Sequence, residues 1–143
     1  MTIIRGIENM NIADIKGNLF EYTKDRVPVH CISQDCQMGA GIAVPMKKEY
    51  HLASLKADKF PDCIYYHGVL NLITKKNYWG KPTYQTLEQS LIKMKEICQK
   101  ENITKVVMPK IGCGLDRLQW PKVREIIQNI FKDTDLDILV CYL

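Results

Sequence analysis

The hydrophobic and polar positions of this chain follow two patterns, short apolar runs and longer segments with helical spacing. The apolar runs predict β-strands at residues 12–16, 27–33, 63–66, 69–74, 105–108 and 136–142. Apolar residues three or four positions apart predict amphipathic helices at residues 40–50, 83–100 and 121–131. Strands that alternate with helices are typical of a three-layer α/β fold, in which helices cover both faces of a largely parallel sheet.

Three residues mark where the predicted helices begin. Pro45 and Pro121 fit only the first turn of a helix, because proline has no N–H to donate further along. Thr83 is expected to cap the helix at 83–100, since its hydroxyl can accept a hydrogen bond from a free N–H of the first turn. The chain contains no linker, repeat or low-complexity segment, so we expect a single domain, 1–143.

Composition narrows the class of protein. A chain of 143 residues, 46% hydrophobic and 25% charged, is typical of a soluble globular domain. No apolar run has the length of a membrane span, and the N-terminal segment with Arg5 and Glu8 lacks an apolar signal core. We therefore expect a monomer in the cytoplasm, or in the nucleus if the source is eukaryotic, with no membrane partner.

Charge and cysteine content argue against three further classes of protein: dedicated nucleic-acid binders, disulfide-linked domains and metal-binding domains. The net charge of +4 is compatible with an anionic ligand, but the lysines do not form the basic stripe of a dedicated nucleic-acid binder. The six cysteines include no C-x-x-C pair, and the three histidines form no spaced cluster. We therefore expect neither a disulfide framework nor a metal site.

The loop after the strand at 105–108 is the first candidate for chemistry. It begins at Pro109, contains Gly112 and Gly114, and ends at Asp116. Glycines at alternate positions allow the backbone N–H groups to approach an anion such as a phosphate. Taken alone, the loop favours a tight turn with a helix-capping aspartate over an anion site, because a short glycine pattern is weak evidence. Cys113 within the loop could be a space-filling side chain.

A second glycine turn, Gly39-Ala40-Gly41, follows the strand at 27–33 and opens a helix. Free N–H groups at a helix start attract anions, although a plain helix-entry turn would have the same sequence. Both glycine segments follow strands, and ligands of α/β sheets bind at the carboxyl ends of strands. Two such turns in one small domain therefore favour a diphosphate ligand.

Two neighbouring lysines and one aspartate supply candidate reactive groups. Lys75 and Lys76 lie at the end of the strand at 69–74, where alternation lets only one of them face a given cleft. A lysine in a cleft can pair with a phosphate or, once deprotonated, attack a sugar carbon. Burial beside Lys76 or Arg117 would assist that deprotonation of Lys75. Asp116 could act as a general base or stabilise an oxocarbenium-like centre.

Together these motifs resemble the macrodomain family. The resemblance covers nearly the whole chain, with its motifs in order at residues 17–20, 30–43, 72–76, 81–84 and 108–120. It is strongest to the terminal ADP-ribose protein glycohydrolase branch, which also contains the macrodomain antitoxins that remove ADP-ribose from DNA. It implies an α/β/α sandwich around a mixed, largely parallel sheet, with ADP-ribose bound over the strand ends and no cofactor.

The resemblance also implies roles for single residues. Lys75 occupies the place of the catalytic lysine that attacks the distal ribose, and Asp116 that of the aspartate that resolves the lysine adduct or assists the first step. Asn18 departs from the aspartate often found beside the adenine amino group, so charge assistance is lost there. The expected ligand contacts are Asn18, Leu19, Ser33, Met38, Gly39, Ala40, Gly41, Ile42, Pro109, Lys110, Ile111, Gly112, Cys113, Gly114, Leu115 and Leu143.

The resulting hypothesis is an ADP-ribosyl hydrolase whose partners are ADP-ribose and ADP-ribosylated protein or DNA. It would release ADP-ribose from glutamate-linked protein or thymine-linked DNA, as in DNA damage reversal or an antitoxin-like role. Two alternatives stay open. One is a reader that binds ADP-ribose without cleaving it, which the presence of both Lys75 and Asp116 disfavours. The other is a phosphatase acting on ADP-ribose 1″-phosphate, which would not need Lys75.

Overall fold

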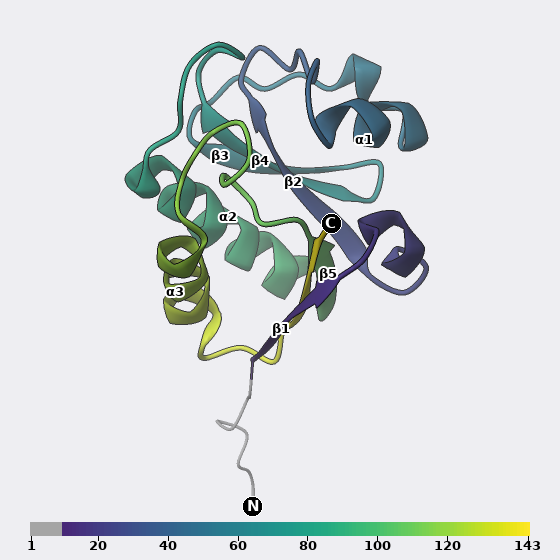
Figure 1. Cartoon of the computed structure of the whole chain (residues 1–143), viewed down its shortest axis with the longest axis vertical. Helices are drawn as coiled ribbons and strands as arrows, with labels where there is room; N and C mark the ends of the chain where they lie inside the picture. The colour runs from purple at the N-terminus through teal and green to yellow at the C-terminus, as the bar shows by residue number, and fades with distance from the viewer. Residues whose placement is uncertain (1–9) are drawn as a thin grey trace, which may run out of the picture.

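The computed structural model describes residues 10–143, which form one six-stranded sheet with helices on both faces (Figure 1). The N-terminal segment with Arg5 and Glu8, where we expected no export signal, lies outside the described residues. The strands are β1 (Asn11–Lys16), β2 (Val27–Ser33), β3 (Asp62–Tyr66), β4 (Val69–Lys75), β5 (Lys105–Met108) and β6 (Asp137–Tyr142). The α-helices are α1 (Ala43–Glu49), α2 (Tyr84–Glu101) and α3 (Trp120–Phe131).

The sheet is mixed and largely parallel, in the order β1-β6-β5-β2-β4-β3. In this order every pair of neighbouring strands is parallel except the last, β4 and β3, which is antiparallel. That pair turns at His67 and Gly68, both with positive φ. Because β2, β5 and β4 are parallel neighbours, their carboxyl ends meet at one edge of the sheet. The loops that follow these strands are therefore brought together.

Two hydrophobic cores lie on the two faces of the sheet. Helices α2 and α3 cover one face, with Leu91 and Phe131 fully buried against it. Helix α1 and the short 3₁₀ helices Leu19–Tyr22 and Leu52–Ser54 cover the other face. Strand β5 shows the alternation directly, because Val106 faces the first core and Val107 the second. The predicted three-layer α/β arrangement is confirmed.

Helix boundaries follow the residues that predicted them, with one exception. Thr83 caps α2 by accepting a 3.0 Å hydrogen bond from the Thr86 N–H, and Pro121 lies at the start of α3. Helix α1 begins at Ala43 and not at residue 40, because Gly41 has a left-handed φ of 60°. The missing turn of helix becomes an open loop of residues 38–42 at the sheet edge. Pro45 remains in the first turn of α1.

Polar contacts attach α3 to the far edge of the sheet. The Trp120 indole donates to Asp14 Oδ2 at 2.7 Å, and Arg124 Nε donates to Asp14 Oδ1 at 3.2 Å. Asp14 therefore has a structural role on β1. Among residues 10–143, no helix has the length and hydrophobicity needed to cross a membrane.

Candidate functional site

A cleft of about 720 Å³ lies where the loops after β2, β4 and β5 meet. Ser33 and the 38–42 turn form one wall, and the loop from Pro109 to Asp116 forms the other. Figure 1 shows these loops together at one end of the sheet, above the labels of β2, β3 and β4. The predicted site residues that line this cleft are Ser33, Met38, Gly39, Ala40, Gly41, Ile42, Lys75, Pro109, Lys110, Ile111, Gly112, Gly114, Leu115 and Asp116.

Lys75 and Asp116 form an ion pair in the cleft. Lys75 Nζ donates to Asp116 Oδ1 at 2.8 Å, and each side chain is only 15% exposed. The end of β4 is irregular at this point: Ile32 pairs with Ile73 but Ser33 pairs with Lys75, so β4 has one additional residue. Such bulges redirect a side chain at the edge of a sheet. Lys76 is exposed and does not line the cleft, and the ion-pair partner of Lys75 is Asp116.

The glycine loop folds back on itself, which brings Asp116 to Lys75. The Leu118 N–H donates to the Gly112 carbonyl at 2.7 Å, and the Arg117 N–H donates to the Gly114 carbonyl at 3.1 Å. Gly112 has a φ of 73°, and Arg117, directly after Asp116, has a φ of 66°. Two left-handed residues thus reverse the chain within a few residues. Glycine adopts such a left-handed φ without the steric cost that a side chain brings.

Asp35 organises the opposite wall of the cleft, although no pattern in the sequence singles it out. Its carboxylate accepts hydrogen bonds from the Ser33 hydroxyl, the Gln37 N–H at 3.3 Å and the Tyr78 N–H at 3.0 Å. Burial works to raise the pKa of Asp35, but these hydrogen bonds outweigh it and hold the pKa below its usual value. The carboxylate therefore ties the loop after β2 to the loop after β4.

Tyr78, Trp79 and Lys81 also line the cleft and were not predicted. They belong to the loop between β4 and α2, which is turned by a 3.0 Å hydrogen bond from the Gly80 N–H to the Asn77 carbonyl. Tyr78 is 61% exposed and Trp79 is 70% exposed. Lys81 Nζ donates to the Leu115 carbonyl at 3.0 Å, across the mouth of the cleft. The sequence signal that could have identified these residues is a pair of adjacent aromatic residues flanked by lysines, directly after a strand.

Four predicted contacts lie outside the lining of this cleft. Asn18 Oδ1 accepts a hydrogen bond from the Phe20 N–H and caps a 3₁₀ helix, and Leu19 is buried in the core under it. The Cys113 thiol contacts the Ile111 carbonyl, and burial raises its pKa to about 11. Leu143 is 94% exposed. The adenine contact predicted at Asn18 therefore lies outside the lining of the cleft around Lys75 and stays a prediction.

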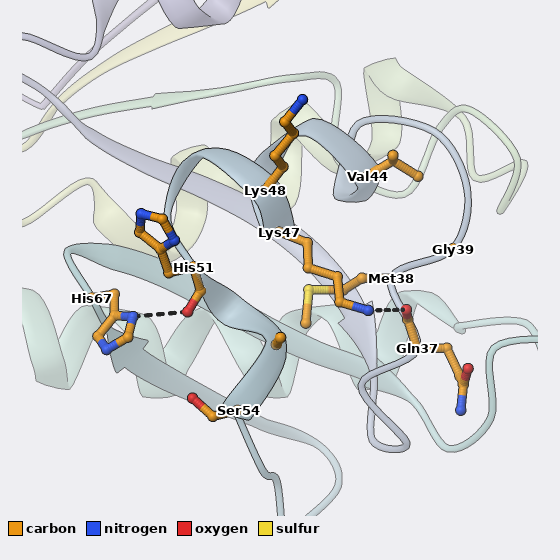
Figure 2. Close-up of a pocket in the computed structure, with 10 residues that line it drawn as sticks. Gln37, Met38, Gly39, Val44, Lys47, Lys48, His51, Ser54 and His67 are labelled. Atoms are coloured by element: carbon orange, nitrogen blue, oxygen red, sulfur yellow. Dashed lines mark hydrogen bonds between the residues drawn. The ribbon is translucent and has the colours of Figure 1, made fainter.

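A second hollow of about 780 Å³ lies beside the cleft and shares the segment 37–39 with it. Figure 2 shows Lys47 reaching from α1 to the Gln37 carbonyl, a contact of 3.4 Å. His51 and His67 lie at the other end of the hollow, where His67 Nδ1 is 3.0 Å from the His51 carbonyl. We call this hollow the basic hollow; it is lined by Gln37, Met38, Gly39, Val44, Lys47, Lys48, His51, Ala53, Ser54 and His67.

His30 and Cys31 are titratable residues whose pKa values are shifted by burial. His30 is fully buried and its Nε2 lies 2.6 Å from Asn71 Oδ1; burial lowers the pKa of His30 to about 4. Burial likewise raises the pKa of the Cys31 thiol to about 12, which leaves it protonated and unreactive at neutral pH. The six cysteines are free thiols, and residues 10–143 contain no group of three or more side chains arranged to hold a metal ion.

Comparison with known proteins identifies the family. The family model described as "Macro domain" matches residues 51–127. ADP-ribose glycohydrolase OARD1 of Bos taurus is 45% identical over 147 residues, which cover 93% of this chain and 92% of that protein.

Solved structures share the fold at lower identity. The macrodomain of Mycobacterium tuberculosis DarG superposes with a TM-score of 0.79 at 21% identity, over 92% of this chain and 97% of that one. Thermosipho africanus DarTG in complex with ADP-ribose superposes with a TM-score of 0.67 at 18% identity, over 92% of this chain and 41% of that one. The strand order, the cleft over the strand ends and these similarities lead to one conclusion: the chain belongs to the macro domain family.

Proposed function

We propose that this protein is an ADP-ribose glycohydrolase that hydrolyses the bond between the distal ribose of ADP-ribose and a modified substrate. The observation that carries the proposal is the Lys75–Asp116 ion pair of 2.8 Å, placed between two glycine turns in one cleft. A relative of 45% identity bears the name ADP-ribose glycohydrolase, and a structural neighbour was solved with ADP-ribose. A pure binding module would need the glycine turns but no such pair.

In the proposed reaction Lys75 is the nucleophile and Asp116 carries protons. Lys75 passes a proton to Asp116, and its neutral amine attacks C1″ of the distal ribose. The bond from C1″ to the substrate oxygen or nitrogen breaks, its electron pair goes to the leaving group, and Asp116 protonates that group. Water then attacks C1″ of the adduct and gives a proton to Asp116. The C1″–N bond breaks with its electrons returning to Lys75, and ADP-ribose is released.

The glycine turns would hold the rest of the ligand. Gly39, Gly41, Gly112 and Gly114 line the cleft on its two sides. Backbone N–H groups of such turns can donate to diphosphate oxygens, because no side chain keeps the ligand away. The diphosphate would then be fixed between the two loops with the distal ribose beside Lys75. No metal is required for this reaction, since the lysine, the aspartate and backbone donors supply the nucleophile, proton transfer and anion binding.

The test is release of ADP-ribose from two substrates in parallel, glutamate-modified protein and thymine-modified DNA. We expect Lys75→Ala to lower release at least about 1000-fold and Asp116→Asn about 100- to 10,000-fold. Lys76→Ala is the matched control, because Lys76 is exposed and does not line the cleft. Mass spectrometry of Asp116→Ala with substrate tests for an ADP-ribosyl adduct on Lys75, which accumulates if water attack depends on Asp116 more strongly than the first step does; its detection would support the lysine nucleophile.

Other outcomes would replace the proposal. ADP-ribose binding by calorimetry with no release from either substrate would make the protein a reader. Cleavage of ADP-ribose 1″-phosphate that survives Lys75→Ala would make it a phosphatase. Release that is unchanged in Lys75→Ala would refute the lysine nucleophile.

A further inference from the structure

Lys81 is a cation of the cleft that has no role in the reaction proposed above. It lines the cleft, and its Nζ donates to the Leu115 carbonyl at 3.0 Å. Leu115 directly precedes Asp116, the ion-pair partner of Lys75. The ammonium group of Lys81 is therefore held at the mouth of the cleft, on the loop that carries Asp116.

The charge of Lys81 is available to a ligand. Lys75 is paired with Asp116 at 2.8 Å, whereas among residues 10–143 Lys81 forms no ion pair with a carboxylate. Its contact with Leu115 is to a neutral carbonyl. An ammonium group has three N–H donors, and this carbonyl takes one of them. The other two can donate to an anion that enters the mouth of the cleft.

The order of the strands indicates which part of a bound substrate would meet Lys81. The glycine turns follow β5 and β2, and Lys75 ends β4, the next strand in the sheet. A diphosphate held between the turns would place the distal ribose at Lys75, so the group attached to C1″ would lie beyond it, beside the segment after β4 that contains Lys81. Lys110 lies towards the other end of the cleft, with its Nζ 4.4 Å from the centre of the Tyr142 ring of β6.

We propose that Lys81 is a further catalytic residue, which stabilises the negative charge that develops on the leaving group. As the bond from C1″ to the substrate oxygen or nitrogen breaks, its electron pair goes to that atom. Lys81 donates a hydrogen bond to the same atom and keeps its own proton, so the proton transfer by Asp116 is unchanged. A cation fixed where charge develops in the transition state lowers the barrier. The inference rests on the proposed function, since it concerns the first step of that reaction.

The contribution of Lys81 should depend on the leaving group. The carboxyl group of glutamate is a strong acid for a side chain, so its anion is stable without assistance. The ring N–H of thymine is a much weaker acid, and the nitrogen anion formed from it gains more from a nearby cation. Loss of Lys81 should therefore slow release from thymine more than release from glutamate. Because Lys81 is exposed, solvent screens its charge and the effect should be smaller than for a donor in a dry site.

The experiment measures single-turnover release of ADP-ribose from glutamate-modified protein and from thymine-modified DNA. Enzyme is varied in excess over substrate, and the rate at saturation separates bond cleavage from binding. Lys81→Gln removes the charge but keeps an N–H donor for the Leu115 carbonyl. We expect it to lower the saturated rate about tenfold on the modified DNA and at most about threefold on the modified protein. Lys81→Arg keeps the cation and should retain most of both rates.

Two further measurements separate this role from a structural one. ADP-ribose has no leaving group, so calorimetry should give the same affinity for it in Lys81→Gln and wild type. Lys76→Gln is the matched control, because Lys76 is an exposed lysine after the same strand that does not line the cleft. It should release ADP-ribose from both substrates at the wild-type rates. Circular dichroism should show that all variants are folded.

Three results would overturn the inference. Wild-type rates in Lys81→Gln on both substrates would show that the charge is not used. An equal fall on both substrates would assign Lys81 to holding the loop of Asp116. A loss of ADP-ribose affinity as large as the loss of rate would make Lys81 a ligand-binding residue.

Failure of this inference and failure of the proposed function have different signatures. Release that depends on Lys75 but is unchanged by Lys81→Gln refutes the role of Lys81 alone. The absence of release by the wild type from either substrate refutes the glycohydrolase, and the role of Lys81 with it.

Discussion

At the scale of single residues, the cleft depends on side chains that hold loops in place as well as on those that would react. Asp35 accepts hydrogen bonds from Ser33 at the end of β2, from Gln37 in the loop after β2 and from Tyr78 in the loop after β4. Ser33 is buried, and its hydroxyl is already engaged by Asp35. Because a hydroxyl oxygen also has lone pairs, Ser33 can donate to Asp35 and still accept a hydrogen bond from a ligand. The contact of Ser33 with a ligand therefore stays a prediction, whereas Asp35 holds the two loops together.

Two glycines of the same loop should respond differently to alanine. Gly112 has a φ of 73°, and a Cβ there would lie 3.0 Å from Leu118 Cδ1. Gly112→Ala should therefore lower the free energy of unfolding by about 1–2 kcal/mol from the left-handed backbone alone. A Cβ at Gly114 would meet no atom within 4 Å, so Gly114→Ala should change stability by less than about 0.5 kcal/mol.

Urea unfolding of the two variants measures this difference. Gly114→Ala also tests how closely a ligand approaches the loop, because its new methyl group affects ADP-ribose affinity without a cost in folding. Equal destabilisation by both substitutions would contradict the described backbone of the loop.

At the scale of elements, α2 anchors the end of β4 from which Lys75 projects. Thr86 Oγ1 donates to the Thr74 carbonyl at 2.8 Å, and Ser90 Oγ donates to the Ile73 carbonyl at 2.8 Å. These carbonyls belong to the residues just before Lys75, where β4 departs from regular pairing with β2. The helix thus supplies hydrogen bonds to backbone groups around the irregularity. Its own first turn is stabilised by Thr83.

Removal of the Thr83 cap should weaken α2 and, with it, the support of β4. The Thr83 hydroxyl accepts from the Thr86 N–H at 3.0 Å, and Thr86 Oγ1 accepts from the Thr83 N–H at 3.0 Å. Thr83→Ala should lower the free energy of unfolding by about 1 kcal/mol. Thr83→Ser keeps the capping oxygen and should retain most of the stability. Thermal or urea unfolding of both variants measures the effect, and equal stability of Thr83→Ala and wild type would show that the cap contributes nothing.

At the scale of the whole molecule, one buried histidine links stability to pH. His30 lies in the central strand β2 and is fully buried beside Asn71 of β4. Burial, only partly offset by the hydrogen bond to Asn71, lowers its pKa from 6.5 to about 4. Between these values the unfolded chain binds a proton that the folded protein does not. The stability contributed by the neutral histidine is therefore present above pH 6.5 and is lost as the pH falls towards 4.

We expect the folded protein to lose up to about 3 kcal/mol over this interval from His30 alone. Urea unfolding at a series of pH values, for wild type and His30→Gln, should show a smaller pH dependence in the variant. His51→Gln, at an exposed position, is the control and should follow the wild type. Parallel curves for wild type and His30→Gln would contradict the assignment of this pH dependence to His30.

Asp35 affects stability at lower pH than His30. Because its pKa in the folded protein lies below the usual value of 3.8, the stability that it contributes is lost as the pH falls from that value.

The order of elements could be predicted from the sequence because it depends on local patterns. Apolar runs, prolines in first turns and Thr83 each act within a few residues, and the strands and helices were found where they were expected. The prediction for α1 was too long at its N-terminal end. Met38 and Gly41 adopt left-handed φ, which ends the helical pattern before Ala43, and the helical spacing of the sequence does not show this. The glycine turns, Lys75 and Asp116 were also selected as a site from sequence, partly through resemblance to a family.

What the sequence by itself determined is therefore the set of elements, the family and the residues at the centre of the cleft. Only the tertiary structure decided how they meet. The 2.8 Å contact of Lys75 with Asp116 joins positions 41 residues apart. The Asp35 carboxylate accepts from the Ser33 hydroxyl and from the backbone N–H of Tyr78, 43 residues further along the chain, and no local pattern in the sequence indicates that second contact. The basic hollow likewise combines α1 with His67 from the turn between β3 and β4. Such contacts depend on the parallel pairing of β2, β4 and β5, which places the loop after each of these strands at one edge of the sheet. A local pattern carries no information about which distant loop will lie beside it.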